Sequence, residues 1–87
     1  MRRETLVLDD RDNVAAAFTN SVAETVHVRM PGGHTLEILL RQAICLGHKF
    51  ALRDITRGSQ VIKSGFPIGT ATKDIALGEH VHTHNLR

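Results

Sequence analysis

The chain has 87 residues, of which 41% are hydrophobic and 23% charged, as in an ordinary globular domain. A chain of this length is too short for two separate cores, so we expect one domain over residues 1–87. Eleven Lys and Arg are interspersed with nine Asp and Glu, and only three aromatic residues are present, which argues against nucleic acid as a partner.

The first predicted element follows a group of aspartates in the segment LDDRDNVAAAF. These acids can cap a helix or lie in its first turn, and Val14, Ala17 and Phe18 follow at helical spacing. The pattern predicts a short helix over residues 11–20.

The next segments, ETVHVRM and HTLEILL, alternate apolar and polar residues with the period of a β-strand. The PGG sequence between them, residues 31–33, supplies a turn. The two segments together predict a β-hairpin. The apolar positions expected to face the core are Val26, Val28, Met30, Leu36, Ile38 and Leu40.

The second half of the chain contains an internal repeat. RDITRGSQVI (53–62) and KDIALGEHVH (73–82) share Asp, Ile, Gly and Val in register, twenty residues apart. In each copy the Asp can bond the backbone of the turn, the Ile and Val can point inward, and the Gly can adopt a positive φ. We expect two equivalent turns in a mainly β domain with one short N-terminal helix.

The chemistry-bearing residues gather near the C-terminus. On a strand, His80, His82 and His84 would lie on one side, about 6.5–7 Å apart, and neighbouring imidazoles could share a divalent metal. A solvated polar face is the alternative explanation of this spacing.

A second group of candidate residues lies in GHKFALRD and just beyond it. Lys49, Arg53 and Lys63 are suitable partners for a carboxylate, although surface solubility also explains isolated cations. Cys45 and His48 have the spacing of a zinc pair, but the flanking Ile44 and Leu46 favour a buried thiol. A lone cysteine and the absence of a long apolar run favour the cytoplasm and exclude a membrane partner.

GHKFALRDI and VIKSGFPIGTATKDIALGEHVHTHN together resemble the N-terminal SAF-type domain of the altronate dehydratase family of hydro-lyases. The resemblance implies a β-clip fold and cytoplasmic dehydration of sugar acids, assisted by a divalent metal such as iron or manganese; zinc is a further candidate. It implies catalytic roles for His48 and Lys49, substrate binding by Lys49, and metal binding by His80, His82 and His84. Ser64 stands where many relatives have tyrosine.

The resemblance also implies a partner. In altronate dehydratase a larger catalytic region follows this domain, whereas in the related sulfolactate sulfo-lyase the domain is a separate small subunit. With the sequence ending at Arg87, the chain resembles the second arrangement, and we expect no lyase activity without a large subunit or domain and a hydroxy-acid substrate. The alternatives are a stand-alone sugar-acid binding module and a metal carrier. A homo-oligomer remains open.

Overall fold

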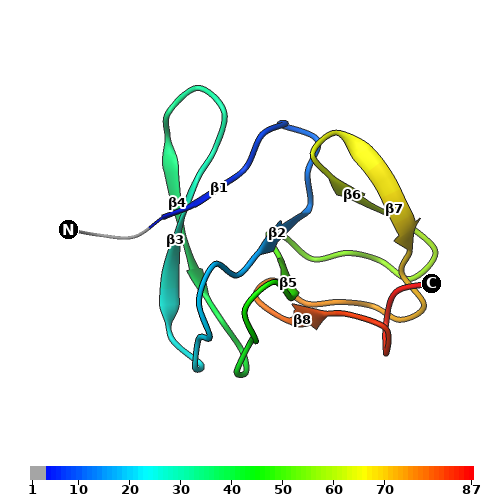
Figure 1. Cartoon of the computed structure of the whole chain (residues 1–87). Helices are drawn as coiled ribbons and strands as arrows, with labels where there is room; N and C mark the ends of the chain where they lie inside the picture. Colours follow the sequence, from blue (N-terminus) through cyan, green and yellow to red (C-terminus); the bar gives the residue numbers. More distant parts are fainter. Residues whose placement is uncertain (1–3) are drawn as a thin grey trace.

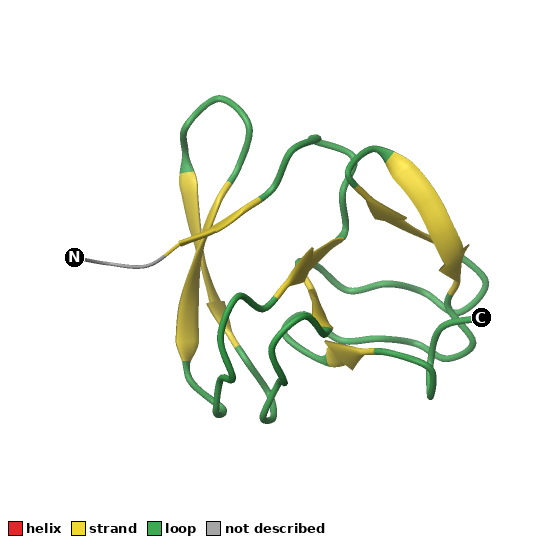
Figure 2. Cartoon of the chain, viewed as in Figure 1, coloured by secondary structure: helices red, strands yellow, loops and turns green. Residues whose placement is uncertain are grey.

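The computed structural model describes residues 4–87 and shows a mainly β fold (Figures 1 and 2). Within that range there is no helix, and hence none long and apolar enough to cross a membrane. The strands are β1 Glu4–Leu6, β2 Val14–Ala16, β3 Thr25–Arg29, β4 Thr35–Leu39, β5 Lys49–Ala51, β6 Gln60–Lys63, β7 Phe66–Thr70 and β8 His80–Val81.

The helix predicted over residues 11–20 is wrong, because β2 occupies its centre and pairs antiparallel with β5. Val14 and Ala15 are both buried, which the two faces of a strand allow. The aspartates also have other partners. Asp9 accepts a hydrogen bond from the Arg11 amide at 2.8 Å, and buried Asp12 accepts bonds from two amides of the distant β6–β7 turn. Long-range pairing therefore overrides the local helical pattern.

The predicted hairpin is confirmed. β3 and β4 pair antiparallel with Val26 opposite Ile38 and Val28 opposite Leu36, and β1 adds to β3 in parallel. Val28 and Ile38 are buried, whereas the alternate positions form the outer face of this sheet. The alternating pattern thus set which side of the hairpin faces the interior.

A second sheet, in the order β2-β5-β8, lies at the centre of the fold (Figure 1). Instead of the single core expected from length, the buried apolar side chains form two clusters, and this sheet contributes to both. Ala15 and Phe50 belong to one cluster, and Val14, Ala51 and Val81 belong to the other. Neighbouring residues of a strand point to opposite faces, so one small sheet separates the two clusters.

The duplicated turns are confirmed and are arranged reciprocally, but the aspartates differ from the prediction, because each bonds the backbone of the other turn and not of its own. Ile55 and Ile75 exchange both backbone hydrogen bonds at 2.8 Å. Asp54 accepts a bond from the Leu77 amide and Asp74 from the Arg57 amide, also at 2.8 Å. The repeat glycines, Gly58 and Gly78, have φ values of 90° and 82°, and the repeat Ile and Val residues are buried.

Sequence analysis missed a third copy of this turn, over residues 44–50 (ICLGHKF). Gly47 has a φ of 82°, its amide bonds the Ala17 carbonyl, and the amide of Leu46 is capped by the Asn20 side chain at 2.8 Å. An asparagine from a preceding loop replaces the aspartate cap. The shared spacing of Ile, Gly and a final apolar residue is the only signal that the sequence offers.

Candidate functional site

The histidines of the two predicted groups meet through the pairing of β5 with β8. In this antiparallel pair Phe50 lies opposite His80 and Lys49 opposite Val81. Continuing the register by one residue places His48 opposite His82, and these rings stack with centroids 4.0 Å apart. The third copy of the turn delivers His48 to this place, because its last two residues, Lys49 and Phe50, already belong to β5.

Three of the imidazoles could share one metal ion. One ring nitrogen from each of His48, His80 and His82 lies within 4.8 Å of the others, and all three side chains are partly buried. His48 Nδ1 and His80 Nε2 are hydrogen-bonded at 2.9 Å, which requires at least one of these rings to be neutral. Three neutral imidazoles with a free position suit a catalytic divalent ion.

The predicted metal residues only partly coincide with this cluster. His84 is exposed, and its ring is tilted by 32° to that of His80 at a centroid distance of 5.1 Å. His84 therefore borders the cluster, and His48 completes it from another part of the chain. Cys45, expected to be buried, is exposed and free.

Asn85 is a functional candidate that sequence analysis missed. Its side chain is fully buried, accepts a bond from the His82 amide at 3.0 Å and donates one to the His80 carbonyl at 2.8 Å. The backbone on both sides of Val81 is thereby held by one amide group. The asparagine directly after HVHTH was the available signal.

The environment favours neutral imidazoles. Partial burial lowers the pKa of His80 below the usual 6.5, and the positive charges of His84, His48 and His82 lower it further. Partial burial, with the charges of His48 and Lys49 next in effect, also lowers the pKa of His82. Neutral rings are the form in which histidine binds a metal.

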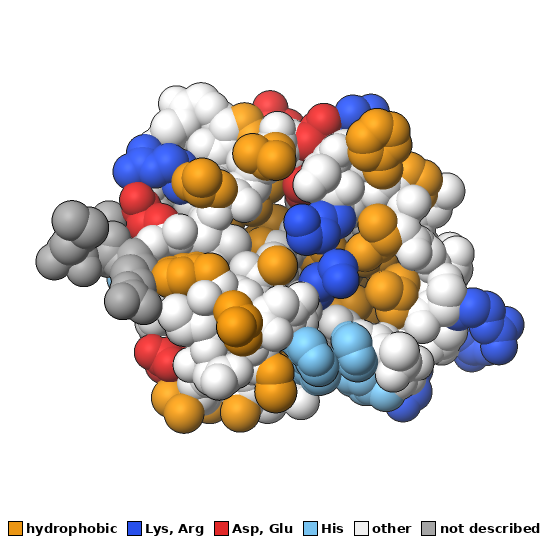
Figure 3. Space-filling view, in the orientation of Figure 1, with side chains coloured by type: hydrophobic (Ala, Val, Ile, Leu, Met, Phe, Trp, Pro, Cys, Tyr) orange, Lys and Arg blue, Asp and Glu red, His pale blue; other side chains and the backbone are white. Residues whose placement is uncertain are grey.

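The predicted carboxylate-binding cations occupy different positions. Lys49 is half-buried in β5, close enough to His82 for its charge to act on that ring. Arg53 is exposed and donates a bond to the Asp12 carbonyl at 3.0 Å. Lys63 is half-buried at the end of β6. Figure 3 shows Lys and Arg side chains in the middle of one face, directly beside the histidines.

Asp12 organises the turn that follows Lys63. Its two carboxylate oxygens accept bonds from the amides of Ser64 and Gly65, each at 2.8 Å. Both turn residues have positive φ values, 54° and 81°, as a tight hairpin turn requires. Ser64, the position of the departure from the family pattern, therefore lies at the tip of the β6–β7 hairpin.

The chain was compared with known proteins. Residues 3–87 match the family model of the altronate/galactarate dehydratase SAF domain. The chain is 50% identical over 76 residues to altronate dehydratase of Escherichia coli (strain K12), an alignment covering 87% of this chain and 14% of the relative. With altronate dehydratase of Bacillus subtilis (strain 168) it shares 37% identity over 78 residues, 88% of this chain and 15% of that relative.

A relative of a second kind is closer to the chain in length. The chain is 41% identical over 58 residues to the (2R)-sulfolactate sulfo-lyase subunit alpha of Chromohalobacter salexigens, which covers 67% of this chain and 62% of that subunit. The chain thus spans only 14% and 15% of the two altronate dehydratases, but most of this subunit.

Proposed function

Because the chain belongs to the SAF-domain family of altronate and galactarate dehydratases, we propose that it is the small subunit or N-terminal domain of a metal-assisted lyase. Its substrate is a sugar acid or another 2-hydroxy carboxylate, such as altronate or sulfolactate. Residues 1–87 form one β-clip domain, and the enzyme works in the cytoplasm. A larger catalytic subunit or domain supplies the rest of the active site.

The observation that carries this proposal is the convergence of His48 with His80 and His82, beside Lys49. These residues come from segments some thirty positions apart, and the pairing of β5 with β8 brings them together. A merely solvated row of histidines needs no fourth histidine from another turn, nor a buried asparagine that holds its backbone.

Within this site His80 and His82, with His48 or His84, would hold a divalent iron, manganese or zinc ion. When bound, such an ion acts as a Lewis acid that polarises a substrate oxygen. The lowered pKa values of His80 and His82 keep these two ligands free of protons near neutral pH. Three protein ligands leave room for a substrate oxygen.

The predicted cations would bind and orient the acid. Lys49 holds the substrate carboxylate, with Arg53 and Lys63 as further donors, because directed cationic donors bind carboxylates well. Elimination removes a proton from C2 and the leaving group, hydroxide or sulfite, from C3. His48 and Lys49 act at the reacting centre, and the larger partner supplies the remaining acid and base groups.

Metal binding by the isolated chain tests this proposal and identifies the ligands. A divalent ion that binds only the folded state stabilises that state and raises its melting temperature. At an ion concentration one hundred times the dissociation constant, the free energy of unfolding increases by about 2.7 kcal/mol. We expect Zn²⁺, Mn²⁺ or Fe²⁺ to raise the melting temperature of the wild type, measured by circular dichroism. The shift should disappear in His48→Ala and largely persist in His84→Ala.

His34 provides the matched control, because it is exposed in the β3–β4 turn, away from the cluster. His34→Ala should respond to metal as the wild type does. A shift abolished by His84→Ala but kept by His48→Ala would favour the ligand set expected from the sequence. No metal response in the wild type would contradict the metal site.

A further inference from the structure

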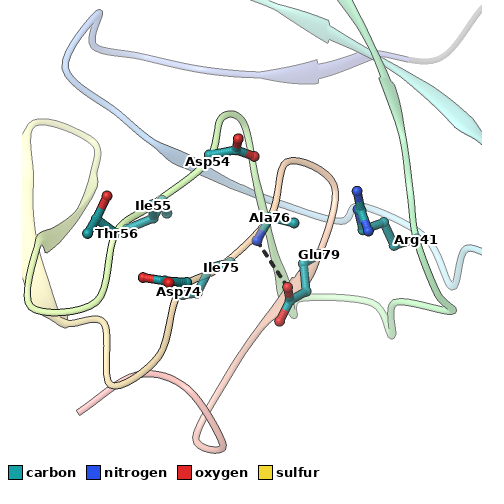
Figure 4. A pocket seen from close by; sticks show the side chains of 8 residues that line it. All are labelled: Arg41, Asp54, Ile55, Thr56, Asp74, Ile75, Ala76 and Glu79. Atoms are coloured by element: carbon teal, nitrogen blue, oxygen red, sulfur yellow. Dashed lines mark hydrogen bonds between the residues drawn. The ribbon is translucent and has the colours of Figure 1, made fainter.

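Two adjoining pockets form a groove on this molecule outside the histidine cluster. The first, of about 440 Å³, lies over the paired DIxxG turns and is lined by Asp54, Asp74, Glu79 and Arg41, among others (Figure 4). The second, of about 720 Å³, shares Arg41 and Asp54 with the first. The shared lining makes them one continuous groove with two chemically different ends.

One end of the groove is apolar. Leu39, Leu40, Leu77 and Ala23 line the second pocket, and Leu39 and Leu77 are 64% and 42% exposed. Leu77 is fixed next to β4, because the backbone of Gly78 packs against the Leu39 carbonyl and accepts a bond from the Arg41 amide. Two exposed leucines that line a pocket form a pre-formed binding site for an apolar side chain.

The other end is negatively charged. Asp54, Asp74 and Glu79 each accept a bond from a backbone amide at 2.8–3.0 Å, which fixes their directions but leaves their charge uncompensated. None of the three forms an ion pair within residues 4–87. Arg41 instead donates to the Leu77 carbonyl at 3.2 Å. The charges of the lining therefore complement a cationic group.

Hydrogen bonds through Asn85 connect the groove to the backbone of the histidines. Glu79 directly precedes β8, and its Oε2 lies 3.5 Å from Asn85 Nδ2. The same nitrogen bonds the His80 carbonyl, and Oδ1 of Asn85 bonds the His82 amide. A segment bound in the groove would thus contact Glu79, the residue directly before β8.

We propose that this groove docks the larger catalytic chain of the lyase, through a segment in which an apolar side chain lies beside Lys or Arg. This inference rests on the proposed function. The two altronate dehydratases are several times longer than the part that matches this chain, so most of each of those enzymes lies outside the matched domain. An apolar anchor with a charged rim is the usual composition of a protein interface.

Binding measurements with point variants test the groove. The probe is the large lyase chain from the same genome, and affinity is measured by isothermal titration calorimetry. We expect Leu39→Asp and, independently, Leu77→Asp to weaken binding at least tenfold. Asp54→Asn keeps the oxygen that accepts from the Leu77 amide and removes the charge, so it should weaken binding several-fold and reduce its salt dependence.

Leu6→Asp is the matched control. Leu6 lies in β1, on the outer face of the β1-β3-β4 sheet that also contains Leu39, and is 65% exposed. It should bind as the wild type does, and circular dichroism should show all variants folded. Wild-type affinity in both leucine variants of the groove, or an equal loss in Leu6→Asp, would overturn the proposal. So would a wild-type dimer that Leu39→Asp converts to a monomer without changing affinity for the large chain.

Catalysis is a separate readout. If the wild-type complex forms and the groove variants weaken it, docking at the groove stands even when the complex turns over no sugar acid and no other 2-hydroxy carboxylate. That result would contradict the proposed function alone. Absence of any complex between the wild type and the large chain would contradict both.

Discussion

Asn85 is the residue on which the geometry of the histidine cluster depends most directly. Histidine side chains can approach a common point only if the backbone that carries them is fixed, and His82 lies beyond the end of β8. The Asn85 amide, fully buried, supplies both a donor and an acceptor to this backbone. No apolar residue of similar size could do so, because buried backbone groups need hydrogen-bond partners.

Asn85→Ala should lower the free energy of unfolding by about 1–3 kcal/mol, because the His82 amide and the His80 carbonyl lose their partner. It should also weaken the melting-temperature response to divalent metal. Urea unfolding with and without metal measures both effects. Asn13→Ala is the matched control, since the Asn13 side chain also donates to one backbone carbonyl, of Gln60, and accepts from one backbone amide, of Ile62, but on β6. An equal loss of the metal response in the two variants would contradict a special role for Asn85.

Acid should destabilise the fold through the histidines. The folded-state pKa values of His80 and His82 lie below 6.5, so the unfolded chain binds protons more tightly. Stability should therefore fall as the pH drops through about 6.5, until these rings are protonated in the folded state as well. Urea unfolding between pH 7.5 and 5, without metal, measures this slope. His80→Gln should flatten the slope, and a wild type that gains stability over this range would contradict the prediction.

At the scale of elements, one turn is used three times. Its copies follow Ile44, Ile55 and Ile75, each with a glycine three residues later whose φ is near 80–90°. The copy at residues 44–50 contains His48 and the copy at residues 73–82 contains His80, so the repeated turn builds the fold and also delivers both sides of the histidine cluster. The middle copy pairs with the last and forms the floor of the charged pocket (Figure 4).

Alanine substitutions should separate backbone strain from steric overlap in these turns. Gly47→Ala and Gly58→Ala should each cost about 1–2 kcal/mol, because φ is positive but the added Cβ meets open space. Gly78→Ala should cost distinctly more, since its Cβ would overlap the Leu39 carbonyl oxygen. Ser59→Ala, at an exposed position in the middle turn, should stay within about 0.5 kcal/mol. Equal costs at the three glycines, measured by urea unfolding, would contradict this ranking.

At the scale of the whole molecule, the central sheet β2-β5-β8 links the parts of the site. Its two faces carry the two apolar clusters, and at one end of β5 and β8 lie the histidines, with Lys49 beside them. Figure 3 shows Lys and Arg side chains next to His side chains on the surface of one face. Under the proposed function this site would bind and orient a carboxylate, and the larger partner would supply the remaining acid and base groups.

The isolated chain should therefore show no turnover of altronate or sulfolactate, and mixing with the large lyase chain should produce it. His84→Ala should abolish turnover in the mixture without changing the fold, because an exposed side chain contributes little to packing. Product formation measured by chromatography distinguishes these cases. Turnover by the chain alone would contradict the need for the large lyase chain. Wild-type turnover in the His84→Ala mixture would show that His84 has no role in the active site.

The sequence by itself determined the features that depend on neighbouring residues. The β3–β4 hairpin followed from period-two alternation and a PGG turn, and the DIxxG turns followed from the repeated motif and its glycine with positive φ. The family membership followed from ordered motifs along nearly the whole chain. Each strand pattern, turn and family motif is a short continuous stretch of the chain, so it can be read before any long-range contact is known.

The tertiary structure alone decided the rest, because it depends on pairing between distant segments. Residues 14–16 became a strand through β5, more than thirty positions away, and the aspartates predicted as helix caps turned to other partners. His48 joined His80 and His82 only through the register of β5 with β8. A local pattern cannot encode such a register, since the same residues would form a different set of neighbours if the strands slipped by one position.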